Sequence, residues 1–212
     1  MRDDVTVLFV CTGNVHRSVL AERLLARRAP AGVRAASAGT RPPGAVPMDA
    51  ATRDVLEELG GEGREFTSRR LTAEQVDRAA LVLGMEREHR EAAVRLRPSA
   101  LGRSFTLLEF VRLAAGAPQG ADPVAYAAGR RGTLPPGPDA IEDPYGQPYE
   151  VLKECGVRIA EAVDAVAEAL AEAPAGAAAG ASTGASTGAS TGGEPTSARG
   201  GPVPVPGTTR RA

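Results

Sequence analysis

Residues 7–18 read Val-Leu-Phe-Val-Cys-Thr-Gly-Asn-Val-His-Arg-Ser, and this stretch decides the fold around it. Its first four residues form a continuous apolar run of strand-forming side chains, which is typical of a buried parallel strand. The run 19–29 that follows places three leucines on one face of a helix. The loop between them therefore lies where a strand ends and a helix begins, the position at which open α/β sheets bind ligands.

This loop carries residue types that can hold a phosphate-sized anion against a thiolate. Free backbone N–H groups and the positive end of the helix favour an anion. Cys11 lies at the base of the loop, where the helix end and Arg17 favour its nucleophilic thiolate form. The planar fork of Arg17 matches two phosphoryl oxygens, and Ser18 can donate a hydrogen bond to the sulfur. The residues predicted to bind the phosphate are Thr12, Gly13, Asn14, Val15, His16 and Ser18.

The opposite interpretation is a buried structural cysteine, because a Cys-x5-Arg spacing also arises by chance and free cysteine is often a small core residue. The strand, the Gly13-Asn14 pair, the closing serine and the helix all fall in register with the cysteine. A motif in its expected structural context favours the functional interpretation.

The stretch resembles the phosphate-binding loop of the low-molecular-weight protein tyrosine phosphatases. Further similarities follow in the family's order and cover most of residues 5–171: Ser37-Ala-Gly-Thr40, Ser68-Arg69-x-Leu71, Leu81-Val-Leu-Gly-Met85 and Asp143-Pro-Tyr-Gly146. The resemblance implies a phosphocysteine intermediate on Cys11, transition-state binding by Arg17 and a general acid at Asp143. Ser37 and Tyr145 are the predicted cleft residues, and Tyr145 either contacts an aromatic leaving group or simply packs.

Splitting a phosphate ester requires a proton for the leaving oxygen, which an aspartate can supply and later recover from water. Two Asp-Pro pairs compete for this role, at Asp122 and at Asp143. Asp122 lies inside a long Gly/Pro/Ala-rich segment, whereas Asp143 leads directly into the last helical stretch. Because a catalytic acid needs fixed geometry, the sequence favours Asp143.

Two loop positions, His16 and Val15, can be compared with the patterns of the family's branches. His16 stands where many relatives have a second cysteine, so the resemblance implies that a reversible disulfide with Cys11 is missing here. His16 either adds positive character near the anion or faces outward. Val15 occupies a position that is threonine in the arginine-phosphatase branch, and an aliphatic residue there resembles the tyrosine-phosphate branch.

The rest of the chain alternates strands with helices, which predicts an α/β fold with a parallel sheet and helices on both faces. The family fold, a four-stranded parallel sheet, agrees with this spacing. Strands are expected at 33–37, 80–84 and 105–108, and helices at 49–59, from Thr72, at 86–96 and to Leu170. The capping box at Thr72 is imperfect, because its acidic residue follows after only two positions.

Four further features of the sequence concern the region outside the phosphate-binding loop. His89 lies in the charged run 86–91, which indicates an exposed helical face. Cys155 belongs to a helical stripe with Ile159 and Val163 and is expected to be a small core residue. Two histidines and two cysteines are too few for a convincing metal site, so no metal and no cofactor is expected. Residues 114–140 are predicted to be either a mobile lid or rim element, or a disordered insertion.

Composition divides the chain into a catalytic domain, 1–173, and a disordered tail, 174–212. The tail repeats Ala-Ser-Thr-Gly three times and offers too little apolar surface to offset the entropy of ordering. Removing the tail's three arginines and one glutamate from the 25 basic and 26 acidic residues leaves 22 and 25, a formal charge of −3. This charge is no electrostatic footprint for nucleic acid. The abundance of Ala, Gly, Pro and Arg predicts a GC-rich genome, such as that of an actinobacterium.

The chain shows neither a signal peptide pattern nor an apolar run that could span a bilayer, and a cytoplasmic, membrane-free protein is therefore expected. Four functions are compatible with the residues, and the leading one is a metal-independent hydrolase of phosphotyrosine in proteins. A thiol-dependent arsenate reductase would need an external thiol, since Cys155 is the only other cysteine. A phosphoarginine phosphatase and a non-enzymatic phosphate-binding module are the remaining alternatives. The oligomeric state is unknown from the sequence.

Overall fold

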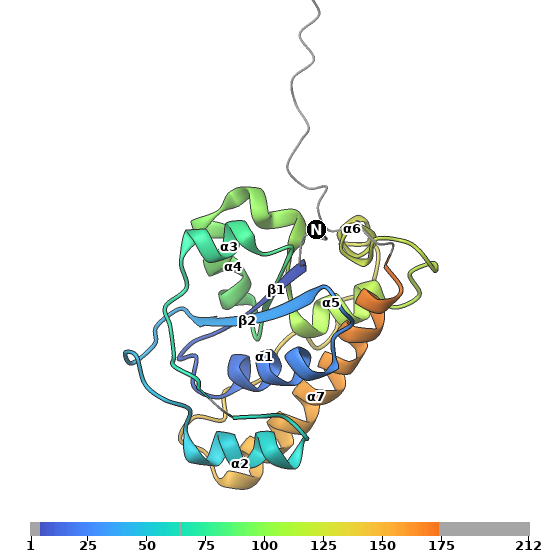
Figure 1. The fold of residues 1–212 in the computed structure, drawn as a ribbon. Coiled ribbons are helices and arrows are strands. Elements are labelled where there is room, and N and C mark those ends of the chain that lie inside the picture. The colour runs from blue at the N-terminus through green and yellow to red at the C-terminus, as the bar shows by residue number, and fades with distance from the viewer. Residues whose placement is uncertain (1–4, 64, 174–212) are drawn as a thin grey trace, which may run out of the picture. The chain divides into compact units, whose positions relative to one another are not determined.

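A four-stranded parallel sheet forms the centre of the molecule (Figure 1). The computed structural model describes residues 5–63 and 65–173, and the predicted disordered tail, 174–212, lies outside the described residues. The strands are arranged in the order β2-β1-β3-β4, and their bounds are β1 Val5–Cys11, β2 Val33–Gly39, β3 Leu81–Gly84 and β4 Ser104–Thr106. Neighbouring strands pair in parallel throughout, as the alternating sequence pattern predicts.

Helices cover both faces of the sheet, so the predicted α/β architecture is confirmed. The helices are α1 Arg17–Arg28, α2 Ala50–Glu58, α3 Ala73–Arg78, α4 Arg87–Leu96, α5 Leu107–Ala114, α6 Pro123–Gly129 and α7 Tyr149–Ala171, with a 3-10 helix, η1, at Pro98–Arg103. Figure 1 shows α1, α2 and α7 on one side of the sheet and α3 and α4 on the other.

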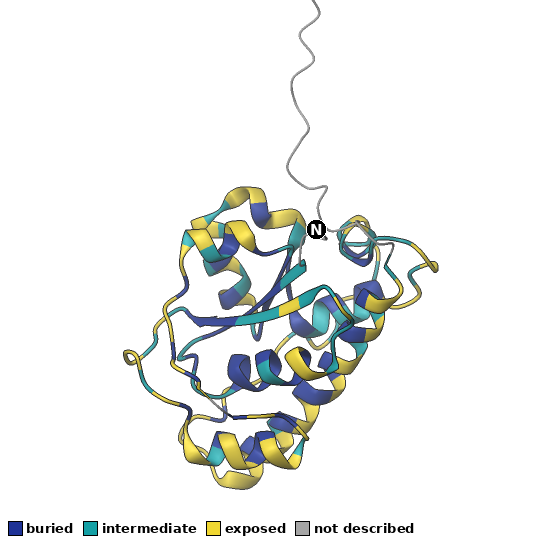
Figure 2. Cartoon of the chain, in the orientation of Figure 1, coloured by how far each residue is buried: buried dark blue, intermediate teal, exposed yellow. Residues whose placement is uncertain are grey.

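Side-chain alternation along β1 explains the two layers. Val7 and Phe9 pack into the larger apolar cluster with α1, α5 and α7, whereas Leu8 and Val10 pack into a smaller cluster with α3 and α4. All four of these side chains are buried. Most of β1 accordingly has the dark blue of buried residues in Figure 2. Because both faces of the sheet are covered, the strand reads as a continuous apolar run rather than an alternating one.

Capping residues set several helix boundaries and correct two expectations. Asp49 caps α2 by accepting a hydrogen bond from the Thr52 N–H at 3.1 Å, as predicted. Thr72 forms a complete capping box, because Gln75 rather than an acidic residue occupies the third position. The expected strand 105–108 is wrong at its end: Thr106 and Glu109 form a capping box that starts α5 at once.

The Gly/Pro/Ala-rich segment 114–140 is neither a lid over the strand ends nor unstructured. It contains α6, and Asp122 caps this helix by accepting from the Val124 N–H at 2.8 Å. The segment is fastened to the opposite end of the sheet, where the Arg131 guanidinium binds the Leu101 carbonyl at 2.6 Å and the Ser104 carbonyl. The lid prediction is therefore wrong, because these contacts hold α6 beside η1 and the beginning of β4.

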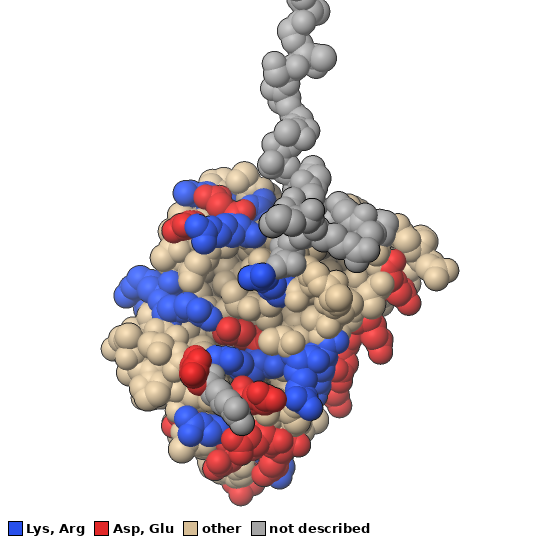
Figure 3. Space-filling view, viewed as in Figure 1, with Lys and Arg blue, Asp and Glu red and all other residues tan. Residues whose placement is uncertain are grey.

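Acidic and basic side chains are mixed over the face shown in Figure 3. Basic groups lie across its middle and left, and acidic groups gather along its lower and right edges. Two ion pairs join α1 to neighbouring segments: Arg28 pairs with Asp164 of α7 at 2.9 Å, and Arg27 pairs with Glu62, after α2, at 3.3 Å. Exposed pairs of this type contribute little stability individually, so the buried clusters carry the fold.

Candidate active site

The loop from Cys11 to Arg17 closes over the carboxyl end of β1, and residues that follow β2 fix its backbone. The Thr40 N–H donates to the Cys11 carbonyl at 2.9 Å, and the Arg41 N–H donates to the Thr12 carbonyl at 2.8 Å. Because a trans peptide points its C=O and the next N–H in opposite directions, the N–H groups of Thr12 and Gly13 point away from this segment. The loop therefore keeps amide donors free of its own backbone pairing, as an anion cradle requires.

Asn14 and Gly39 allow the loop to take this shape. Asn14 adopts a left-handed backbone conformation with φ of 52°, which asparagine tolerates better than most residues. Gly39 lets β2 approach the loop closely, because a Cβ at this position would lie only 2.7 Å from the Thr12 carbonyl oxygen and 2.9 Å from the Asn14 nitrogen. A larger residue at 39 would push the loop out of place.

Hydrogen-bond donors converge on the sulfur of Cys11. The Asn14 N–H donates to Sγ at 3.2 Å, and the Ser18 hydroxyl lies 3.0 Å from the same atom. The Asn14 side-chain amide donates to the Ser18 oxygen at 3.0 Å, which leaves the Ser18 proton available for the sulfur. Two hydrogen-bonding groups thus point at the Cys11 sulfur beside the amino end of α1.

A buried polar network supports the loop from behind. The Asn14 amide also donates to the Ser37 hydroxyl at 2.8 Å, and Ser37 in turn donates to the Glu22 carboxylate. Arg69 binds both oxygens of Glu22 at 3.0 and 3.2 Å, and its backbone N–H donates to the Asn14 side-chain oxygen at 2.9 Å. Ser37 is fully buried in this network, so its predicted place in the cleft is wrong.

Arg17 is the most deeply buried arginine of the site, with a side chain only 1% exposed. Its guanidinium donates to the Ile141 carbonyl at 2.8 Å and to the Asp143 carboxylate at 2.5 Å, and it also pairs with Glu86. Arg17 thus joins the segment before α4 to the segment before α7, directly beside the loop. These partners hold the guanidinium plane in a fixed orientation.

The loop opens into a cleft of about 270 Å³. Its lining residues come from the loop, from the segment after β2 and from the segment after Asp143: Cys11, Thr12, Gly13, Val15, His16, Arg17, Arg41, Pro43, Asp143 and Tyr145. The cleft therefore brings together the candidate nucleophile, the candidate phosphate-binding arginine and the favoured aspartate. Asp122 caps α6 instead, which leaves Asp143 as the aspartate of the two that faces Cys11.

The family comparison agrees with this geometry. Residues 6–132 match the family model described as low molecular weight phosphotyrosine protein phosphatase.

The chain belongs to this family.

Among curated relatives of this low-molecular-weight phosphatase, the tyrosine phosphatase Etp of Escherichia coli K12 is 38% identical over 47% of the chain and 67% of the relative. The protein-arginine-phosphatase of Geobacillus stearothermophilus is 32% identical over 76% of the chain and 93% of the relative. The solved structure of Vibrio vulnificus Wzb in complex with benzylphosphonate is 26% identical, with a TM-score of 0.60 over 77% of this chain and 97% of that one.

His16 and Tyr145 form the aromatic rim of the cleft. The His16 Nδ1 lies 2.5 Å from the Thr52 hydroxyl, and its ring centroid lies 6.1 Å from that of Tyr145. Burial lowers the pKa of His16, although Asp49 and Asp143 act in the opposite direction. His16 is thus neither the outward-facing residue nor the added positive charge considered from the sequence. Tyr145 is 75% exposed, so it lines the mouth and is not a packing residue.

The structure adds functional candidates that the sequence reasoning missed. Glu86, which pairs with Arg17, and Arg41 and Pro43, which line the cleft, carry no motif of their own. Arg69 lies in the Ser-Arg element quoted from the sequence, but its contact with Asn14 depends on tertiary structure. A polar residue just after a buried strand was the available signal for Glu86.

His89 corrects a sequence expectation directly. Its side chain is completely buried rather than exposed, and its Nε2 lies 2.9 Å from the Thr12 hydroxyl in the loop. Burial, followed by the charge of Arg17, lowers the pKa of His89, which keeps the ring neutral. The charged run 86–91 predicted an exposed helical face. The prediction is wrong for His89 because the first turn of α4 packs against the loop.

Cys155 is less buried than expected. The buried stripe of α7 is confirmed for Ile159 and Val163, but the Cys155 side chain is only partly covered. Its sulfur lies 4.0 Å from the Glu142 carbonyl, and burial raises its pKa to about 11. Cys155 does not line the cleft that contains Cys11.

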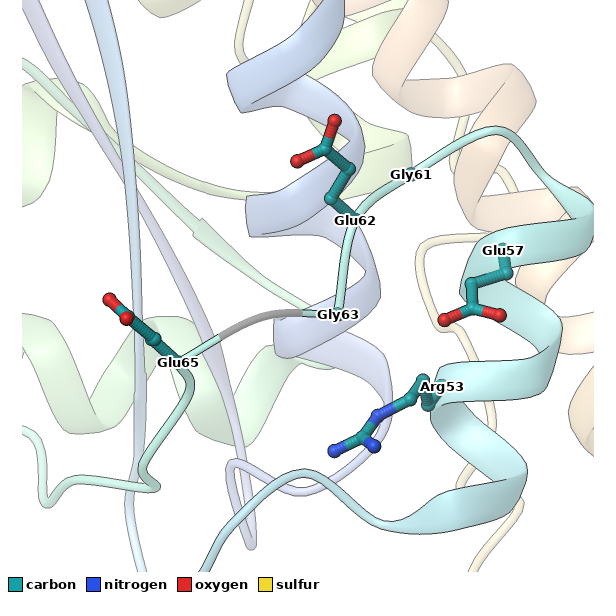
Figure 4. A pocket seen from close by; sticks show the side chains of 6 residues that line it. All are labelled: Arg53, Glu57, Gly61, Glu62, Gly63 and Glu65. Atoms are coloured by element: carbon teal, nitrogen blue, oxygen red, sulfur yellow. The ribbon is translucent and has the colours of Figure 1, made fainter.

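A second, larger hollow lies beside α2 and does not match the chemistry (Figure 4). It measures about 660 Å³, and Figure 4 shows Arg53 and Glu57 projecting from α2 while Glu62 and Glu65 come from the loop that follows. Three carboxylates beside one arginine repel a phosphate dianion, and the hollow contains no nucleophile. The smaller cleft at Cys11 is therefore the candidate site.

Across residues 5–63 and 65–173, no cluster of three or more histidine, cysteine, aspartate or glutamate side chains is placed to hold a metal ion. No helix in those ranges combines the length and apolar character needed to cross a membrane.

Proposed function

We propose that this chain hydrolyses phosphotyrosine in proteins through a phosphocysteine intermediate on Cys11. The observation that carries the proposal is the meeting of Cys11, Arg17 and Asp143 in one cleft, with donors already directed at the sulfur. The family assignment and the relatives named as tyrosine phosphatases support the same chemistry.

In the first step the Cys11 thiolate attacks phosphorus, the S–P bond forms and the bond to the leaving oxygen breaks. Asp143 gives its proton to that oxygen, so the leaving group departs as a neutral phenol. The loop N–H groups and the Arg17 fork stabilise charge on the equatorial oxygens of the transferring phosphoryl group.

In the second step water attacks phosphorus, the S–P bond breaks and the thiolate returns. Asp143 accepts a proton from the attacking water, which restores the acid for the next cycle. Ser18, with its proton free for Sγ at 3.0 Å, stabilises the departing thiolate. Cys11 and Asp143 account for every bond and proton that changes in the two steps. The proposed mechanism therefore uses no metal and no other cofactor.

The Arg17–Asp143 ion pair links substrate binding to the role of Asp143 as the acid. A bound phosphoryl group competes for the guanidinium that Asp143 holds at 2.5 Å in the free protein. The displaced carboxyl group is then free of the ion pair and can serve as the acid at the leaving oxygen.

The cleft walls favour an aryl phosphate. Val15, Pro43 and Tyr145 offer apolar and aromatic surface above the loop, which suits a phenyl ring. The benzylphosphonate in the Wzb relative also has an aromatic ring close to a phosphorus group. Phosphotyrosine-containing proteins are therefore the proposed partners; a cytoplasmic location stays a prediction.

Phosphoarginine is the second candidate substrate. A relative that is 32% identical over 76% of this chain is named a protein-arginine-phosphatase, and Asp143 at the cleft could face a guanidinium as well as a phenol. A matched pair of peptides, one with phosphotyrosine and one with phosphoarginine, separates the two. A higher kcat/KM for the phosphoarginine peptide would reverse the proposed preference.

The mechanism is tested by measuring aryl phosphate hydrolysis with EDTA present, in the wild type and in Cys11→Ser and Asp143→Asn. Full activity in EDTA and loss in both variants supports the proposal. Activity that survives Cys11→Ser, or that requires added metal, contradicts it. Arsenate with and without an external thiol serves as the parallel substrate, since Cys155 lies outside the cleft and offers no internal relay.

A further inference from the structure

The buried imidazole of His89 touches the phosphate-binding loop at one atom and its own helix start at another. Its Nε2 lies 2.9 Å from the Thr12 hydroxyl oxygen. The Glu86 backbone N–H donates to its Nδ1 at 3.1 Å. The ring is therefore a bridge between the first turn of α4 and the second residue of the loop.

These two contacts determine which nitrogen carries the proton. Nδ1 accepts from a backbone N–H and must be unprotonated, so in the neutral ring the proton resides on Nε2. Nε2–H then donates to the Thr12 oxygen, with a Glu88 carboxylate oxygen as a more distant neighbour at 3.5 Å. The other charged groups that act on the ring are Arg17, Glu86 and Asp143.

The consequence falls on Thr12, which lines the cleft. Its hydroxyl oxygen is occupied by the His89 donor, and its backbone carbonyl is held by the Arg41 N–H at 2.8 Å. The hydroxyl proton of Thr12 is then free to be donated to a ligand. A hydroxyl without the His89 contact could instead turn its proton toward a protein acceptor.

We propose that His89 is a positioning residue that directs the Thr12 hydroxyl proton to an oxygen of the substrate phosphoryl group. The inference rests on the proposed function only for the identity of the ligand, since inorganic phosphate presents the same oxygens. His89 itself does not touch the substrate.

The backbone around His89 is built for this close contact. Gly84 ends β3 immediately before the turn into α4, and a Cβ there would lie 2.7 Å from the Arg90 nitrogen and 3.0 Å from the His89 Cβ. Glycine at 84 therefore lets the first turn of α4 approach the sheet. This approach carries the His89 ring, which has no exposed surface, to the loop.

A double-mutant cycle with Thr12→Val and His89→Phe tests the inference. We measure the dissociation constant of inorganic phosphate by calorimetry, together with KM and kcat for an aryl phosphate. Each single variant should weaken phosphate binding and raise KM about 5- to 10-fold, which is the effect expected from the loss of one hydrogen bond. The double variant should be no worse than either single variant, because both changes remove the same donor.

His89→Gln is the matched control, because its amide N–H can still donate to Thr12; it should keep phosphate binding within about 2- to 3-fold of the wild type. Effects that multiply in the double variant, or a His89→Phe enzyme that binds phosphate normally, would overturn the inference. Phosphate binding that follows this pattern in a protein without turnover would refute the proposed function and leave the inference standing.

A second readout uses the unaltered protein and does not depend on the variants folding. The ring nitrogens of His89, observed by nitrogen-15 NMR at neutral pH, should show a neutral ring protonated at Nε2. A proton on Nδ1, or a fully charged ring, would contradict the proposal, because neither state fits the Glu86 N–H contact together with a free Thr12 proton.

Discussion

The two cysteines of this chain have opposite surroundings. Cys11 ends a buried strand, and its sulfur accepts from the Asn14 N–H at 3.2 Å and faces the Ser18 hydroxyl at 3.0 Å. Cys155 lies in the second turn of α7, where its sulfur neighbours a carbonyl oxygen at 4.0 Å and burial raises its pKa to about 11. Burial alone therefore suppresses a thiolate, and directed donors are needed to support one.

The comparison also shows where the chain places its polar groups. Around Cys11, the buried residues Asn14, Ser37 and Glu22 form a connected network, and each of them has a hydrogen-bond partner. Around Cys155 the stripe of α7 is apolar. A satisfied polar network is retained in a core where it fixes one geometry, and here that geometry belongs to the phosphate-binding loop.

Serine substitutions at Cys11 and Cys155 should differ most in their effect on kcat. Cys11→Ser should reduce kcat for an aryl phosphate by at least about 10³-fold, because the weak alcohol replaces the nucleophile. Cys155→Ser should stay within about 2-fold of the wild type, and circular dichroism should show both variants folded. A large loss in Cys155→Ser would remove the distinction between the two thiols.

The two Asp-Pro aspartates extend the contrast to the proton donor. Asp143→Asn should lower kcat about 10²- to 10⁴-fold, with the larger loss for poorer leaving groups that need the proton more. Asp122→Asn should leave kcat unchanged, since asparagine caps a helix about as well as aspartate. A leaving-group series of substituted phenyl phosphates provides the measurement, and a loss in Asp122→Asn instead would reassign the acid.

Chemical modification compares the reactivity of Cys11 and Cys155 in the unaltered protein. At pH 7 a thiol with a pKa of about 11 is ionised to about one part in 10⁴, so Cys155 should react slowly with iodoacetamide. Cys11 should be labelled first, and inorganic phosphate should protect it. Peptide mapping after peroxide should likewise show oxidised Cys11 without a disulfide to Cys155. Preferential labelling of Cys155, or that disulfide, would contradict the account.

The Asn14 network should matter for stability as well as activity. Asn14→Ala removes the side-chain hydrogen bonds to Ser18, Ser37 and the Arg69 N–H and leaves a φ of 52° on alanine. The expected cost is about 2–4 kcal/mol in the free energy of unfolding, measured in urea. Asn14→Gly relieves the backbone but not the network, so it should recover only part of the loss.

The smallest expected effect is the pH dependence of stability. Burial lowers the pKa of His89 below its usual 6.5 in the folded protein, so the unfolded chain binds the extra proton first as pH falls. Stability should therefore decrease from about pH 7 toward pH 5. Urea unfolding at both pH values should show a shallower decrease in His89→Phe than in the wild type. An identical pH slope in the two proteins would argue that His89 is charged in the folded state.

Much of the fold and the centre of the site could be predicted from the sequence. The local sequence was sufficient for the apolar run of β1 and for Cys11, Gly13 and Arg17. Their roles depend on neighbours that lie only a few residues away along the chain. The start of α5 was missed because Thr106 and Glu109 form a capping box that competes with the apolar strand pattern. Residue type and spacing decide such cases only when the local signals agree.

The parts that were missed depend on tertiary contacts. His89 was expected on an exposed face because the five other residues of the run 86–91 are all charged. The close approach that Gly84 permits buries its ring instead. Ser37 was assigned to the cleft, yet it bonds Glu22 behind the loop. Contacts that join residues tens of positions apart have no local signature in a single sequence.

Rapid denaturation of the enzyme during turnover of an aryl phosphate, followed by mapping of phosphorus onto its peptides, tests the phosphocysteine mechanism most directly. We expect a phosphoryl group on the peptide that contains Cys11 and none on the peptide that contains Cys155. Turnover without any phosphorus on Cys11 at the shortest accessible times would contradict it.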